Sequence, residues 1–92
     1  MKFDWDNKKA ILNLKKHKVS FEEASTVFFD PLAKLAVDPD HSVSENRMIL
    51  IGHSHTSSLL FVVHIYKDNE DIIRIISARK ATKKETKDYR QL

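Results

Sequence analysis

The chain contains no cysteine, one glycine (Gly52) and two prolines among its 92 residues. Without cysteine, it cannot form disulfides, thiolate nucleophiles or cysteine-based zinc and iron–sulfur sites, so packing alone must hold the fold. A single glycine excludes a glycine-rich phosphate loop and the nucleotide hydrolysis that depends on one. No apolar run approaches the roughly 20 residues of a membrane-spanning helix. We therefore expect one soluble, cytoplasmic domain over residues 1–92, with no cofactor and no membrane partner.

Positive charge is only slightly in excess but is unevenly distributed along the chain. There are 16 Lys and Arg against 13 Asp and Glu, which gives a net charge of +3. Residues 74–92 hold seven basic residues against two acidic ones, and residues 8–18 hold five lysines and no acid. Such segregation favours a polyanionic partner. A solvated helix surface explains either basic segment equally well, so charge alone does not identify the partner.

Residues 1–30 have the pattern of two short helices. Asp6 is placed to cap the first helix with its side chain. The residues expected to form the buried stripe of that helix are Ala10, Ile11 and Leu14. Ser20 and Glu23 have the spacing of a capping box, in which each side chain bonds to the other residue's backbone N–H, and they predict the start of the second helix. That helix should end at Asp30, because proline disfavours a helical conformation in the residue before it.

Four runs of β-branched and apolar residues follow, each with the length of a strand: residues 33–37, 47–53, 59–66 and 72–77. Their connections are too short for crossover helices, so consecutive strands should pair antiparallel. A second capping box, Thr82 to Glu85, predicts a C-terminal helix with few apolar residues to anchor it. We therefore predict an α+β fold in which two N-terminal helices pack on a four-stranded antiparallel meander sheet and a C-terminal helix follows.

The fourth predicted strand leads directly into a basic segment that contains Arg79 and Lys80. The planar fork of Arg79 suits a phosphate, or the extra negative charge of a phosphorane-like transition state, and Lys80 adds a second charge. The structural alternative is an ion pair between Arg79 and a carboxylate near the end of the sheet. Arg79 is the principal candidate for a functional residue.

Three residues on neighbouring strands could converge on a second cluster, depending on register. His64 and Tyr66 share one side of their strand because side chains alternate. If His64 opposes Arg74 across the sheet, all three side chains meet, whereas a slip of one residue sends Arg74 to the other face. His64 could then act as a base or acid, and Tyr66 could stack on a nucleic-acid base. A histidine within a strand is more often simply hydrogen-bonded.

Four histidines could be mistaken for a metal site: His41, His53, His55 and His64. Two of them, His53 and His55, can share one strand face, but residues 54–58 have the composition of a loop and an accompanying carboxylate is missing. We therefore expect no metal site.

Several motifs together resemble the BrnT family of toxins in their order and spacing, over nearly the whole chain. The matching segments are Phe3-Asp4-Trp5-Asp6, Asn13-Leu14-Lys15-Lys16-His17, Val19-Ser20-Phe21-Glu22-Glu23-Ala24, Phe28-Phe29-Asp30-Pro31 and Arg74-Ile75-Ile76-Ser77-Ala78-Arg79-Lys80-Ala81. One departure is Lys18, which stands where the family usually has a glycine that ends a helix in the left-handed conformation.

This resemblance implies a RelE-like fold with a curved antiparallel sheet, and a metal-independent endoribonuclease that arrests translation. It further implies a BrnA-like antitoxin of ribbon–helix–helix type, with promoter DNA bound through the complex of both proteins. The catalytic candidates carried over to this sequence are Arg47, His64, Arg74 and Arg79. The candidates for RNA contact are Lys16, Tyr66, Lys80, Lys83 and Lys84. Two alternatives stay open: a basic module that binds nucleic acid without cutting it, and a purely structural partner protein.

Overall fold

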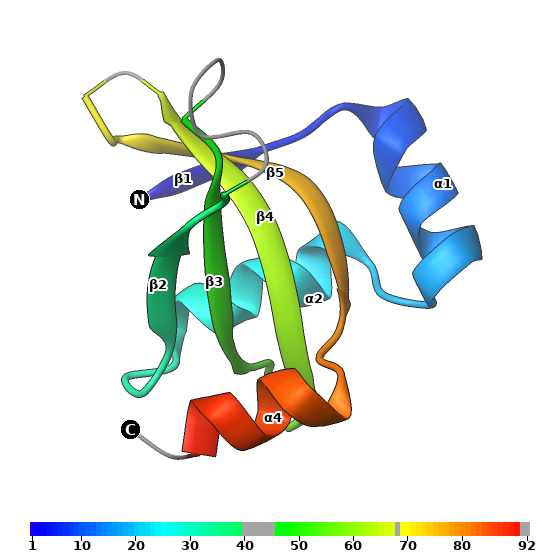
Figure 1. Cartoon of the computed structure of the whole chain (residues 1–92). Helices are drawn as coiled ribbons and strands as arrows, with labels where there is room; N and C mark the ends of the chain where they lie inside the picture. The colour runs from blue at the N-terminus through cyan, green and yellow to red at the C-terminus, as the bar shows by residue number, and fades with distance from the viewer. Residues whose placement is uncertain (40–45, 68, 91–92) are drawn as a thin grey trace.

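A computed structural model of the chain describes residues 1–39, 46–67 and 69–90. It contains one five-stranded sheet with the strand order β1-β5-β4-β3-β2, as Figure 1 shows. The elements in chain order are β1 (Lys2–Asp4), α1 (Asn7–His17), α2 (Phe21–Thr26), a 3₁₀ turn η1 (Val27–Phe29), β2 (Lys34–Val37), β3 (Met48–His53), β4 (Leu59–Lys67), β5 (Ile72–Lys80) and α4 (Lys83–Arg90). Within the described ranges, no helix is long and apolar enough to cross a membrane.

The predicted four-stranded antiparallel sheet is wrong, because the chain begins with a strand that joins the sheet. β1 pairs in parallel with β5, Phe3 lying opposite Ile73, so the sheet is mixed. The other strands pair antiparallel with their neighbours in the order β2-β3-β4-β5. A three-residue strand is too short to show a period-two pattern, and its partner lies about 70 residues away in sequence.

The first helix docks on the sheet through an amide instead of the predicted apolar stripe. Ile11 and Leu14 are 59% and 49% exposed, so their predicted burial is wrong. Asn13 is buried in their place, and its side chain donates to the carbonyl of Ala78 at 2.8 Å and accepts from the amide of Ala78 at 3.1 Å. Asn13 thereby satisfies both backbone groups of one β5 residue, which fixes the helix at one position along the strand.

The N-terminus of α1 forms as predicted, and its C-terminus adopts the left-handed conformation although Lys18 stands in place of glycine. Asp6 accepts a hydrogen bond from the amide of Lys8 at 2.8 Å and caps the N-terminus. At the C-terminus Lys18 adopts the left-handed conformation, with φ 61°, and its N–H donates to the carbonyl of Leu14 at 3.0 Å. A lysine thus occupies a position that favours glycine, at a modest cost in strain.

The second helix is shorter than predicted and continues as the 3₁₀ turn η1, which lies against β3. Gly52 makes this approach possible. A Cβ atom at Gly52 would lie 2.8 Å from the Cβ of Ala33 and 3.0 Å from both Asp30 and Val27. Phe21, at the start of α2, is fully buried and anchors the helix in the core. The only glycine of the chain therefore serves helix-to-sheet packing.

The two faces of the sheet have different surroundings. Leu60, Val62 and His64 of β4 are fully buried on the face covered by α1 and α2. The alternate residues of β4 lie on the opposite face, which we call the outer face. The outer-face residues that matter below are Arg47, Ile49, Phe61, Val63, Ser77 and Arg79.

Candidate active site

A hollow of about 520 Å³ lies on the outer face of the sheet. Its walls come from β3, β4, β5 and the segment after β2, and its lining residues are Asp38, Pro39, Arg47, Ile49, Phe61, Val63, Ser77 and Arg79. Arg79 and Phe61 are direct partners across β5 and β4, and Ser77 and Val63 are partners two residues further along. The hollow therefore has an apolar floor formed by the sheet, and its charged lining residues are Arg47, Arg79 and Asp38.

The Arg79 guanidinium lies over an aromatic ring. Its guanidinium carbon is 4.0 Å from the ring centroid of Phe61, a cation–π contact. Nη1 and Nη2 donate to the two carboxylate oxygens of Glu85 at 2.8 and 2.9 Å. This pairing lowers the pKa of the Glu85 carboxyl and raises the pKa of Arg79, so both groups stay charged. The predicted structural alternative, an ion pair near the end of the sheet, is thus present.

The ion pair with Glu85 leaves part of the Arg79 guanidinium available for other hydrogen bonds. An arginine has five N–H donors. The bidentate pair with Glu85 uses one on each terminal nitrogen, and Nη1 also donates to the carbonyl of Lys80 at 3.3 Å. The Arg79 side chain keeps 34% of its surface exposed. Glu85 therefore fixes the plane of the fork against Phe61 and leaves further donors for an incoming phosphate, while it offsets part of the positive charge.

Arg47 and Arg74 lie on the same side of the sheet as Arg79. Arg47 directly precedes β3 and lines the hollow, and its carbonyl accepts from the amide of the buried Asp38 at 2.9 Å. Arg74 lies further along β5, where Nη1 is 3.5 Å from a carboxylate oxygen of Asp4. That oxygen is also 3.6 Å from the ammonium group of Lys67. The outer face thus carries three of the four catalytic candidates, of which Arg47 and Arg79 line the hollow.

The fourth candidate, His64, lies on the other face. A bulge between Val63 and His64 sets the register so that Ile65, not His64, opposes Arg74. Of the two registers that the sequence left open, the structure has the one in which Arg74 lies on the other face from His64 and Tyr66.

The His64 ring is enclosed by other side chains and by the sheet. It contacts Tyr66 edge-on at 5.1 Å between centroids and Phe28 at 4.8 Å, and it is 0% exposed. Burial lowers the pKa of His64 to about 4, so the ring is neutral near pH 7. A neutral, enclosed imidazole on the helix side cannot reach a phosphate bound on the outer face.

The RNA-contact candidates are dispersed over the molecule. Lys80 follows Arg79 on β5 and therefore points to the helix side, where its charge contributes to the lowered pKa of Glu23. Lys16 is exposed on α1, which packs on that same side. Lys83 and Lys84 are exposed on α4, whose Glu85 contacts Arg79. None of these lysines lines the hollow, and the two on α4 are linked to it through the contact of Glu85 with Arg79.

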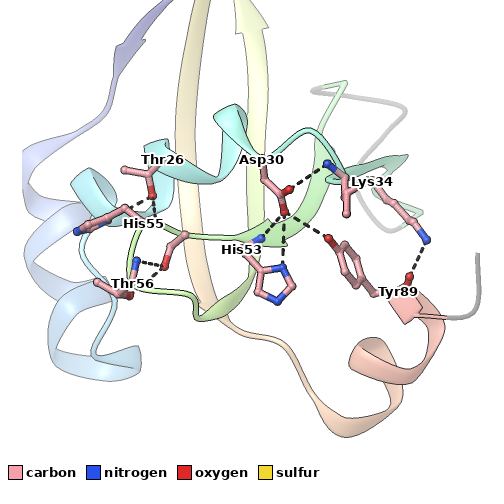
Figure 2. Close-up of polar contacts among 9 residues, drawn as sticks. Thr26, Asp30, Lys34, His53, His55, Thr56 and Tyr89 are labelled. Atoms are coloured by element: carbon pink, nitrogen blue, oxygen red, sulfur yellow. Dashed lines mark hydrogen bonds and ion pairs between the residues drawn. The ribbon is translucent and has the colours of Figure 1, made fainter.

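A second polar cluster, centred on Asp30, joins η1, β3 and α4 (Figure 2). The Asp30 carboxylate accepts from the amide of His53 at 2.7 Å and from the Tyr89 hydroxyl at 3.3 Å, and these bonds lower the pKa of Asp30. Tyr89 also accepts a bond from the Lys34 ammonium through its backbone carbonyl at 2.6 Å. The cluster fastens the C-terminal helix to the sheet, and its histidine is part of a structural network.

Metal-binding side chains do not gather in the described ranges, which hold no group of three or more histidines and carboxylates suited to a metal. His41 lies outside those ranges. Sequence reasoning missed Phe61 as the support for Arg79, because an aromatic residue in an apolar strand has the same pattern as any core residue. It found Glu85 as a cap but missed its pair with Arg79, since the two are brought together only by the turn after β5.

Comparison with known proteins identifies a toxin family. A profile of the family described as "Ribonuclease toxin, BrnT, of type II toxin-antitoxin system" matches residues 5–85. Among solved structures, the chain is similar to the Brucella abortus ribonuclease toxin BrnT, determined by crystallography at 1.1 Å resolution. The TM-score is 0.70 and the identity 22%, over 90% of this chain and 99% of that chain. The likeness shows a BrnT-like fold. No curated protein matches.

Proposed function

The chain belongs to the BrnT family of ribonuclease toxins of type II toxin–antitoxin systems, and on this premise we propose that it cleaves RNA, without a metal ion, in the hollow on the outer face. One observation carries the proposal: the Arg79 guanidinium is held over the Phe61 ring in a hollow that Arg47 also lines. Two permanent cations above a rigid apolar floor fit an RNA backbone, whose phosphates carry the charge and whose bases can stack on aromatic rings.

The proposed reaction is in-line attack of a ribose 2′-oxygen on the adjacent phosphorus. The 2′-hydroxyl loses its proton to solvent water, the new O2′–P bond forms, the P–O5′ bond breaks and the departing 5′-oxygen takes up a proton from water. The products are a 2′,3′-cyclic phosphate and a 5′-hydroxyl. Arg79 and Arg47 stabilise the extra negative charge of the phosphorane-like transition state, a contribution worth roughly 100- to 1000-fold per donor in comparable sites.

His64 has no role in this proposal, because it is buried on the opposite face. Catalysis rests on the placement of charge and on the alignment of the substrate. Arg74 and the two exposed lysines of α4, Lys83 and Lys84, extend the positive surface along which the RNA would lie. Lys16, Tyr66 and Lys80 lie away from the outer face and receive no substrate contact.

The biological role proposed for this chain is the one expected of the BrnT family. We propose that cleavage arrests translation in the cytoplasm and that a BrnA-like antitoxin of ribbon–helix–helix type neutralises the toxin. Promoter DNA would be bound through the complex of the two proteins.

The products of the reaction test this mechanism. Purified, antitoxin-free protein should cleave an end-labelled RNA in excess EDTA and leave a 2′,3′-cyclic phosphate. A 2′-deoxy nucleotide at the scissile position should block cleavage there. Cleavage that requires added Mg²⁺, or that persists at the deoxy nucleotide, contradicts the mechanism. Salt-dependent binding without any product would favour the non-cutting nucleic-acid module instead.

A further inference from the structure

An apolar groove of about 430 Å³ runs between α1 and α2, on the side of the molecule remote from the hollow. Its lining residues are Trp5, Asn7, Ala10, Ile11, Leu14, Ser20, Phe21 and Glu22. We call it the α1–α2 groove. Its inner wall is continuous with the core, since Phe21 is fully buried and packs edge-on against Trp5 at 5.9 Å between centroids.

The outer wall of the groove consists of apolar side chains that the fold leaves in solvent. Ile11 and Leu14 are 59% and 49% exposed. They lie three residues apart and therefore project from the same side of α1. Exposed aliphatic residues grouped around an apolar groove are typical of a surface that another protein covers. Leu12 is 64% exposed but does not line the groove.

The charge of α1 indicates which kind of molecule occupies the groove. Glu22 of α2 is an acidic lining residue of the groove, but α1 carries Lys8, Lys9, Lys15 and Lys16 and no acidic residue. Two of these, Lys8 and Lys15, lie three residues before and four residues after Ile11, so they border the apolar strip on its own helix. RNA would satisfy the lysines but would leave the aliphatic side chains uncovered. An amphipathic helix with apolar residues at helical spacing and carboxylates beside them satisfies both.

We propose that the α1–α2 groove is the docking site for an acidic amphipathic helix of the antitoxin. The inference rests on the proposed toxin function for the identity of the partner, and on the groove for the place and chemistry of contact. Because the groove lies on the helix side and the hollow on the outer face, antitoxin anchoring and RNA cleavage are separable by substitution.

Titration calorimetry of purified toxin with its full-length cognate antitoxin tests the proposal. The double variant Ile11→Asp/Leu14→Asp should bind roughly 100-fold more weakly, because two apolar contacts are replaced by charges that repel the acidic helix. Leu12→Asp is the matched control, with the same substitution on a more exposed residue of the same helix outside the groove, and it should bind within about threefold of wild type. The gentler pair Ile11→Ala/Leu14→Ala should give an intermediate loss, and thermal unfolding should show that all three variants fold.

A separate variant tests the contribution of the α1 lysines to antitoxin binding. Lys8→Glu/Lys15→Glu should also weaken binding, and the affinity that remains should be less sensitive to salt than that of wild type. Wild-type affinity of Ile11→Asp/Leu14→Asp, or an equal loss in Leu12→Asp, would overturn the proposal. RNA cleavage by each free variant should equal that of wild type. If wild type does not cleave RNA but the double variant still loses the antitoxin, the proposed function fails and the groove assignment stands.

Discussion

Arg79 and Glu85 connect the end of β5 to the C-terminal helix through two parallel hydrogen bonds of 2.8 and 2.9 Å. Glu85 also caps α4, because it accepts from the amide of Thr82 at 2.9 Å while the Thr82 hydroxyl accepts from the amide of Glu85 at 3.1 Å. The carboxylate that completes the helix cap is therefore the one that orients the arginine. An RNA phosphate at Arg79 has to share the guanidinium with Glu85 or displace it.

Neutralising Glu85 should strengthen RNA binding. In Glu85→Gln the amide can still contact Arg79 but no longer offsets its charge. The dissociation constant for RNA should fall, and the slope of log affinity against log salt should steepen by about one unit, as for one additional phosphate contact. Asp88→Asn is the control, because it removes the same charge from the exposed surface of the same helix. Equal changes in both variants would show that general electrostatics alone, and not the pair with Arg79, governs binding.

His64 should make the fold sensitive to acid without contributing to catalysis. Its pKa is about 4 in the folded chain against 6.5 for an ordinary histidine. Between these values the unfolded chain binds a proton that the folded chain does not, so the free energy of unfolding should fall as the pH drops from 6.5 to 4. The loss should reach about 3 kcal/mol at pH 4. Urea unfolding at a series of pH values measures it.

The variant His64→Leu separates this structural role from a catalytic one. It should lose the part of the pH dependence that lies between pH 6.5 and 4, because the group that titrates is gone. Its rate of RNA cleavage at neutral pH should stay within about twofold of wild type, the range expected of a conservative core substitution remote from the site. A large loss of cleavage in a folded His64→Leu protein would place His64 in the active site.

Lys18→Gly should stabilise the chain by about 0.5–1 kcal/mol, because Lys18 has a left-handed backbone, with φ 61°, that glycine adopts without strain. Lys16→Gly, two residues earlier inside the helix, should instead cost about 1 kcal/mol. Chemical denaturation of both variants measures the difference. Destabilisation by Lys18→Gly would mean that the lysine side chain supports the helix end.

Local signals in the sequence were sufficient for much of the fold. Side-chain caps at Asp6 and Ser20 mark the starts of α1 and α2, and the apolar runs mark four of the five strands. β1 was missed because three residues carry no periodicity and its partner is distant in sequence. The burial of Asn13 in place of Ile11 and Leu14 was missed because helical periodicity identifies apolar faces, whereas this helix docks through backbone hydrogen bonds of β5.

Part of the candidate active site was also predictable from local sequence signals. Arg79 stood out because a buried strand leads into it. Its predicted partnership with Lys80 is wrong, because β5 continues through Lys80 and alternation puts the two side chains on opposite faces. The role of His64 depended on register, and a single bulge after Val63 moved Arg74 to the other face. A bulge depends on packing across the whole sheet, and the sequence of neither strand indicates where one will occur. The pairing with Glu85 likewise depends on how α4 folds back over the sheet.

Single-turnover cleavage of RNA in EDTA by Arg79→Ala and Lys80→Ala, compared with wild type, tests most directly whether the outer face carries the reaction. The two residues are neighbours of like charge on opposite faces of β5. If the outer face is the active site, Arg79→Ala should lose roughly 100-fold or more in rate and Lys80→Ala should stay within a few-fold of wild type, with both proteins folded by thermal unfolding. Wild-type cleavage by Arg79→Ala, or an equal loss in both variants, would contradict that assignment.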